Sequence, residues 1–162
     1  MNYCTLFDST YTSRGISLIK SINSTHSHAD VYVLAMDDKV ADKILASELS
    51  NVKVVQLNDL FAEYPVLTDL LEQRSRAEFC WTLTPYILHW CLVKHNLSDC
   101  TYVDSDIYFY SSPEIVFKSL GSNSVIITEH NYTPEYDQSA TSGKYCVQFM
   151  FFKNNIKGLE VL

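Results

Sequence analysis

The sequence predicts an α/β protein with a mainly parallel sheet and flanking helices. Short apolar, β-type runs alternate with segments whose apolar residues recur at helical spacing. Acidic and small polar residues follow several of these runs, as is typical of the carboxyl edge of a parallel sheet. The chain of 162 residues is 47% hydrophobic and 19% charged, which is a globular composition with enough length for one domain, 1–162.

The first third of the chain has the pattern β-α-β-α-β, in which right-handed crossovers join parallel strands. The predicted strands are residues 3–7, 31–36 and 52–57. We expect residues 8–10 to cap a helix over 15–22, and a turn over 23–30 to follow. Asp37 and Asp38 are expected to start the next helix. That helix should place four apolar residues on one face: Val40, Ile44, Leu45 and Leu49.

The middle of the chain is predicted to be helical. Residues 60–76 form an irregular helical stretch broken by Pro65. Residues 79–90 form a helix with Pro85 in an early position, and large side chains cover most of its circumference. We therefore expect a deeply buried helix, whose aromatic residues belong to the core.

Two carboxylates follow the next strand, over 101–103. Residues two apart in a strand project to the same side, so Asp104 and Asp106 can converge on one cation if the chain stays extended through Ser105. Oxygen ligands of this kind suit hard divalent ions, with substrate phosphates completing the shell. The alternative is a pair of solvated aspartates in a turn. A second β-type run, 107–110, is expected to follow.

The last third is predicted to contain a short helix, two strands and a loop. The helix starts at Ser112 and Pro113 and stops at Gly121. The strands are 125–128, ended by Glu129, and 145–153, with a loop over the site between them. Residues 156–162 look like the first turns of a helix that is cut short, so we expect the chain to be incomplete at its carboxyl end.

Composition excludes several classes of function. A net charge of -7 argues against binding of nucleic acid through its phosphates, although a metal can still attract a nucleoside diphosphate. The five cysteines are scattered, which favours reduced core cysteines over a zinc site. No apolar run reaches the ~18 residues of a membrane span, and no signal peptide precedes the first strand. We expect a cytoplasmic protein, with the inner face of the membrane as a second placement.

Four motifs occur in order along the chain: T-L-F-D-S-x-Y (5–11), W-T-L-T-P (81–85), Y-V-D-S-D (102–106) and G-K-Y-C-V-Q-F (143–149). Together they resemble the amino-terminal portion of bacterial GT-A glycosyltransferases, which use nucleotide-sugar donors. The resemblance covers nearly the whole chain. It implies a Rossmann-like, nucleotide-sugar-binding GT-A sheet.

The resemblance also implies roles for individual residues. Residues implied to bind the nucleotide-sugar are Thr5, Phe7, Asp8, Tyr11, Asp37 and Ser105. Asp104 and Asp106 match the family's D-x-D motif, which implies Mn²⁺ or Mg²⁺ bridging the donor's diphosphate.

Three departures stand out. Similar transferases often have a cationic side chain where this chain has Tyr86 and Ile87, a role for which Arg74 or Arg76 would have to substitute, and Cys146 stands where relatives often have Asn. The family usually runs on past Leu162, and that later part supplies acceptor contacts and often a His that completes the metal shell, whereas no His follows Lys153 here.

An inverting transferase needs a base near the acceptor hydroxyl. Glu129 is the candidate we name, and its alternative is an ordinary exposed acid. Gln148 either faces the sugar or is a polar residue of an edge strand.

The main functional hypothesis is therefore a metal-dependent sugar transferase acting on a saccharide or lipid-linked acceptor in polysaccharide biosynthesis. One alternative is a truncated or degenerate nucleotide-binding domain without turnover. Another is an aspartate-based phosphohydrolase, although such enzymes place the aspartate pair after the first strand. An apolar surface left by a missing portion would favour self-association into a homo-oligomer.

Overall fold

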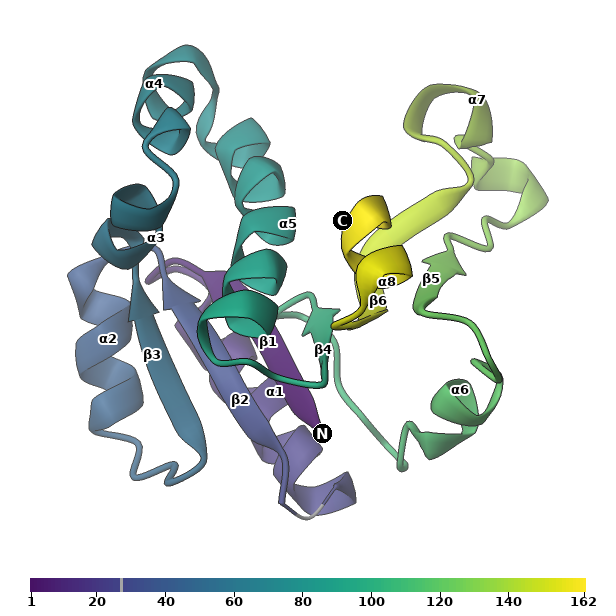
Figure 1. Cartoon of the computed structure of the whole chain (residues 1–162), viewed down its shortest axis with the longest axis horizontal. Helices are drawn as coiled ribbons and strands as arrows, with labels where there is room; N and C mark the ends of the chain where they lie inside the picture. The colour runs from purple at the N-terminus through teal and green to yellow at the C-terminus, as the bar shows by residue number, and fades with distance from the viewer. Residues whose placement is uncertain (27) are drawn as a thin grey trace.

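A computed structural model describes residues 1–26 and 28–162 and shows one six-stranded sheet flanked by helices (Figure 1). The strands are β1 (Asn2–Phe7), β2 (Asp30–Ala35), β3 (Val52–Gln56), β4 (Asp99–Val103), β5 (Val125–Glu129) and β6 (Tyr145–Lys153). Their order across the sheet is β3-β2-β1-β4-β6-β5. The predicted mainly parallel α/β fold is confirmed. Residue 27, inside the turn predicted over 23–30, lies outside the described residues.

Strands β1 to β4 pair in parallel, whereas β6 lies antiparallel between β4 and β5. The described connection from β4 to β5 contains only the short helix α6 (Glu114–Lys118), and β5 reaches β6 through η1 (Pro134–Tyr136) and α7 (Ser139–Ser142). A parallel pair needs a long crossover, whereas antiparallel neighbours do not. The chain ends in α8 (Ile156–Val161), which packs on β6.

Helices cover both faces of the sheet because its central strands are apolar on both sides. In β1, Cys4 and Leu6 face the core under α3 (Leu57–Glu63), α4 (Val66–Gln73) and α5 (Arg76–Lys94). Tyr3 and Phe7 alternate with them and face α1 (Thr12–Thr25) and α2 (Asp38–Leu45). Figure 1 shows α5 across the front of the sheet and α1 behind it.

The two predicted caps have different outcomes. Asp37 caps α2 as expected, since its side chain accepts a hydrogen bond from the Val40 N–H at 3.1 Å. No side chain caps α1, which begins only at Thr12. Asp8 instead closes a turn, in which its carboxylate accepts the Thr10 N–H at 2.8 Å. The prediction that residues 8–10 cap α1 is wrong because this turn comes between the strand and the helix.

The shared apolar face predicted for α2 is only partly present. Val40 and Ile44 are buried, but Leu45 is 73% exposed and Leu49 lies beyond the helix end. Leu45 follows Ile44 directly and therefore points about 100° away from it around the helix.

Helix α5 differs most from its prediction. It begins at Arg76, where Ser75 and Glu78 form a capping box, so Pro85 lies in its middle and not near its start. The helix packs one face on the sheet and leaves the other in solvent, with Trp81 66% exposed. The expectation of a deeply buried helix with its aromatic residues in the core is wrong at Trp81, because apolar residues here occupy both the packed and the outer face.

The β-type run predicted over 107–110 is not a strand. After β4 the backbone turns immediately, and the Ile107 N–H donates to the Asp104 carbonyl at 3.1 Å. Among the residues that the structure describes, no helix is both long enough and apolar enough to cross a membrane.

Candidate functional site

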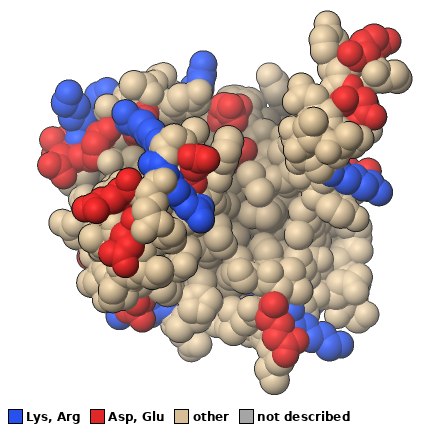
Figure 2. Space-filling model, turned by 90° about the horizontal axis from the view of Figure 1, so that it is seen from above, with Lys and Arg blue, Asp and Glu red and all other residues tan. Residues whose placement is uncertain are grey.

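The carboxyl ends of β1 and β4 border a cavity of about 460 Å³. This volume lies within the range of roughly 300–1,000 Å³ typical of small-molecule sites. Seen from above, the molecule is hollowed in the middle, and charged side chains gather around the hollow (Figure 2). The cavity occupies the position at which open α/β sheets bind their ligands, beyond the carboxyl ends of neighbouring strands.

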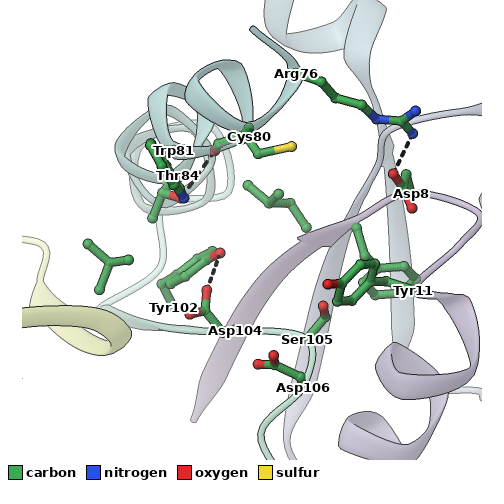
Figure 3. A pocket seen from close by; sticks show the side chains of 14 residues that line it. Asp8, Tyr11, Arg76, Cys80, Trp81, Thr84, Tyr102, Asp104, Ser105 and Asp106 are labelled. Atoms are coloured by element: carbon green, nitrogen blue, oxygen red, sulfur yellow. Dashed lines mark hydrogen bonds and ion pairs between the residues drawn. The ribbon is translucent and has the colours of Figure 1, made fainter. Parts of the chain in front are cut away.

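The end of β1 and the segment after it supply Phe7, Asp8 and Tyr11, three of the residues that the resemblance implies for nucleotide-sugar binding. Phe7 is buried, and its ring fills the space over Gly15 of α1, where an added Cβ would overlap it. Asp8 forms an ion pair with Arg76 from the start of α5 (Figure 3). Burial raises the pKa of Asp8, but hydrogen bonds from Thr10 and the charge of Arg76 outweigh it, so the pKa lies below 3.8.

The end of β4 supplies Asp104, Ser105 and Asp106 to the same cavity. The chain does not stay extended through Ser105, which was the condition for convergence by strand alternation; a turn instead carries both carboxylates to the cavity. Tyr102 donates its hydroxyl to Asp104 Oδ1 at 2.9 Å. Burial raises the pKa of Asp104, and the nearby Asp106 raises it further, while the Tyr102 hydrogen bond acts in the opposite direction.

Helix α5 forms a wall of the cavity, and of its lining residues the sequence pointed only to Arg76, as a substitute cation. Its residues Arg76, Ala77, Cys80, Trp81 and Thr84 line the cavity. Their spacing places them on one side of the first turns. The capping box at Ser75 was the available signal, since it marks a helix start whose first turns lie beside the β1 end.

Two predicted nucleotide-binding residues do not line the cavity. Thr5 is only 1% exposed, inside β1, and its hydroxyl has no hydrogen-bond partner among the described residues. Asp37 accepts hydrogen bonds from the Ser9 and Val40 N–H groups. It thereby joins the loop after β1 to the start of α2, which is a structural task beside the cavity.

The candidate base Glu129 and the loop predicted to cover the site also lie apart from this cavity. Glu129 pairs with Lys144 at 2.9 Å, and both side chains are more than half exposed. Residues 131–144 supply none of the lining side chains that the structure describes, although they were predicted to cover the site. From β6 the lining residue is Val147, while the Gln148 carbonyl accepts the Asp104 N–H at 2.9 Å.

Three of the five cysteines meet in the core. The sulfur atoms of Cys4, Cys91 and Cys100 lie within 4.8 Å of one another, and all three residues are fully buried. They fit the prediction of unpaired core cysteines. Within residues 1–26 and 28–162 no fourth metal-ligating side chain joins them, whereas a structural zinc site has four ligands.

The cavity offers a different kind of donor set. The carboxylates of Asp104 and Asp106 are hard oxygen donors, and Ser105, between them in the sequence, adds a hydroxyl to the same cavity. Mg²⁺ and ions like it commonly take one or two carboxylates and complete their shell with water and phosphate oxygens. The residues present therefore fit an ion of this class.

Comparison with known proteins places the fold. An active-site mutant of the protein LgtC matches with a TM-score of 0.62 over 95% of this chain, at 15% identity. Mouse xyloside xylosyltransferase 1 matches with a TM-score of 0.58 over 95%, at 9% identity. The glycosyltransferase GlyE of Streptococcus pneumoniae TIGR4 matches with a TM-score of 0.56 over 99%, at 11% identity. The chain has the GT-A-like fold of these glycosyltransferases.

Two curated sequences from Bacillus subtilis (strain 168) are similar to this chain, and both are described as uncharacterised. YfnF is 27% identical over 99% of this chain, and YfnD is 30% identical over 74%. The chain spans 55% of YfnF and 39% of YfnD, and 57% of the LgtC chain. No known family profile matches the sequence.

Proposed function

We propose that the protein is a metal-dependent glycosyltransferase that moves a sugar from a nucleoside-diphosphate donor to a saccharide or other hydroxyl acceptor. One observation carries the proposal: two acidic positions from different strands, Asp8 after β1 and the Asp104–Asp106 turn after β4, line one cavity of a GT-A-like fold. One of the similar structures is LgtC in complex with donor and acceptor sugar analogs, which supports these ligand classes.

Each wall of the cavity suits a part of such a donor. The Arg14 guanidinium lies over one face of the Tyr11 ring, 4.5 Å from its centroid, so the ring would offer a base its other face, and Asp8 can accept hydrogen bonds from ribose hydroxyls. The Arg76 guanidinium, paired with Asp8, adds a positive charge at the Asp8 and Tyr11 end of the cavity. Thr5 and Asp37 have no part in this proposal, because one is buried and the other caps a helix.

Asp104 and Asp106 would hold Mn²⁺ or Mg²⁺. When bound, such an ion acts as a Lewis acid that neutralises charge on the departing nucleoside diphosphate. Tyr102 orients one oxygen of Asp104 by its hydrogen bond, which leaves the other oxygen free to face the cavity. The Asp104 N–H, held by the Gln148 carbonyl, fixes the turn to β6. The donor site is therefore built from backbone as well as side-chain contacts.

The catalytic base stays a hypothesis. Glu129 is more than half exposed and is held by Lys144, so it would act only on an acceptor bound at that end of β5. Because the chain spans about half of its curated relatives, acceptor contacts and turnover belong to the proposal for the whole protein.

A direct assay tests the proposal. The chain is incubated with UDP- and GDP-sugars, with and without Mn²⁺, and release of nucleoside diphosphate is measured. Metal-dependent release that increases with added saccharide would support a transferase. Cleavage of a generic phosphate ester with no release from nucleotide-sugars would favour the phosphohydrolase. Nucleotide binding with no release would favour a domain that only binds the donor.

A further inference from the structure

The wall of the cavity formed by α5 carries a large aromatic side chain in an unusual position. Trp81 lines the cavity and is 66% exposed, and Val147 of β6 lines the same cavity and is 43% exposed. A fully buried aromatic side chain removes about 150–250 Å² of surface from water. An exposed Trp81 therefore contributes little of the hydrophobic stabilisation that its burial would give. Two exposed apolar residues from different elements on one cavity indicate a surface that a ligand covers.

The geometry of α5 explains why Trp81 faces the cavity. The residues that anchor the helix to the core include Phe79, Leu83 and Ile87. Trp81 lies on another side, which it shares with Ala77 four residues before and Thr84 three residues after it. Both of these neighbours also line the cavity. The Trp81 ring is therefore presented at the cavity wall by a helix that is itself firmly packed.

The cavity is divided into two ends. Figure 3 shows Asp8, Tyr11 and Arg76 together at one end, with Trp81 and Thr84 above Tyr102 and Asp104 at the other. In the proposed function the nucleoside occupies the Tyr11 end and the diphosphate lies at Asp104 and Asp106. A group bound beyond Asp104, on the Trp81 side, is then on the sugar side of the diphosphate.

We infer that Trp81 is the stacking surface of a saccharide subsite that binds one pyranose ring. A pyranose has an apolar face of C–H groups and an edge of hydroxyls. The indole ring can cover the C–H face, and Val147 can border it. Thr84 is only 3% exposed and donates its hydroxyl to the Cys80 carbonyl at 3.4 Å, so the ring contacts of the subsite fall to Trp81 and Val147. The inference rests on the proposed function for the direction in which the donor lies.

The ring could belong to the donor sugar or to a saccharide acceptor, and a fluorescence titration separates the two sources. The chain has two tryptophans, and the other, Trp90, packs against His95. In a Trp90→Phe variant, all tryptophan emission comes from Trp81. This variant is titrated with UDP, GDP, UDP-glucose, GDP-mannose, lactose and maltose, each with Mn²⁺ present.

We expect a sugar-bearing probe to change the Trp81 emission where UDP and GDP alone do not. A change with UDP-glucose or GDP-mannose assigns the ring to the donor, and a change with lactose or maltose assigns it to the acceptor. In both cases Trp81→Ala should weaken binding of that probe by about tenfold, which corresponds to ~1.4 kcal/mol, and Trp81→Phe should restore part of it. Val93→Ala, an exposed apolar change on the same helix, should have no effect.

Two outcomes overturn the inference and leave the nucleotide site in place. One is an unchanged Trp81 emission with every sugar-bearing probe while UDP or GDP still binds, which leaves the donor site standing. The other is equal weakening of UDP and UDP-glucose by Trp81→Ala, which would make Trp81 a nucleotide contact. A response to lactose or maltose without any nucleotide binding would keep the saccharide subsite and remove the proposed donor site. A third outcome removes both sites: no Trp81 response to any sugar-bearing probe together with no binding of UDP or GDP in calorimetric titration.

Discussion

The buried hydroxyl of Tyr102 donates to Oδ1 of Asp104 at 2.9 Å, so the last side chain of β4 that faces the cavity holds the first carboxylate of the turn that follows. The contact joins a core residue to the proposed metal ligand. It also compensates in part for the burial that raises the pKa of Asp104. The position of this carboxylate is thus fixed before any ligand arrives.

Tyr102→Phe should weaken metal-dependent nucleotide binding, because Asp104 loses its orienting donor. It should also lower the free energy of unfolding by about 1.5–3 kcal/mol, the usual range for a hydrogen bond to a charged group. Calorimetric titration and urea unfolding measure the two effects.

Tyr3→Phe is the matched control for this prediction, since the buried Tyr3 hydroxyl bonds His26 Nδ1 at 3.0 Å near the start of β1, away from the cavity. This control should lose stability without losing nucleotide affinity. Equal nucleotide affinity in Tyr102→Phe and wild type would contradict the orienting role.

The ion pair of Asp8 predicts a dependence of stability on pH. Because the folded-state pKa of Asp8 lies below 3.8, its ionised form stabilises the fold at pH values above 3.8. This contribution is lost as the pH falls below 3.8 through the folded-state pKa. The difference in unfolding free energy between wild type and Asp8→Asn should therefore be constant near neutral pH and shrink in acid. A difference that does not change over this range would show that Asp8 is not stabilised as an anion.

Gly15→Ala should destabilise the protein by about 1–3 kcal/mol, as overpacking does in cores. A Cβ at this position would overlap the Phe7 ring, which lines the cavity. The result is diagnostic because helix propensity alone favours Ala over Gly by about 1 kcal/mol. Ser13→Ala, at an exposed position of α1, serves as the control in urea unfolding. Stabilisation by Gly15→Ala would mean that Phe7 moves aside at no cost.

Ser75→Ala should cost about 1 kcal/mol, since the Ser75 hydroxyl caps the start of α5. Amide hydrogen exchange should accelerate over the first turn of α5, which carries Arg76 and leads to the cavity wall. Ser17→Ala, in the exposed middle of α1, should leave both unfolding and exchange of α5 unchanged. If the exchange rates of the first turn of α5 are the same in Ser75→Ala and wild type, the Ser75 cap does not stabilise that turn.

The sequence predicted the strands well, because their apolar runs are separated by clear polar breaks such as Asp8 and Asp37. It did not predict that β6 lies between β4 and β5. That arrangement depends on pairing between residues far apart in the chain, as in Tyr102 with Met150, and no local pattern encodes it.

The candidate site was predictable where it follows strand ends, as at Asp8 and Asp104. On α5 the capping box at Ser75 marks the helix start, but periodicity cannot distinguish the exposed Trp81 from the buried Leu83, because apolar residues surround the helix. The sequence also gives no sign that Cys4, Cys91 and Cys100 meet, since three separate elements bring them together.

The most direct test of the central claim is calorimetric titration of UDP and GDP, each with and without Mn²⁺. Wild type is compared with Asp104→Ala/Asp106→Ala and with a charge-matched control, Asp42→Ala/Asp69→Ala, whose positions are exposed on α2 and α4. We expect Mn²⁺-dependent binding of one nucleotide by wild type and by the control, and loss of this binding in Asp104→Ala/Asp106→Ala. Absence of binding by the folded wild-type chain, or equal binding by all three proteins, would contradict a metal-assisted nucleotide site at Asp104 and Asp106.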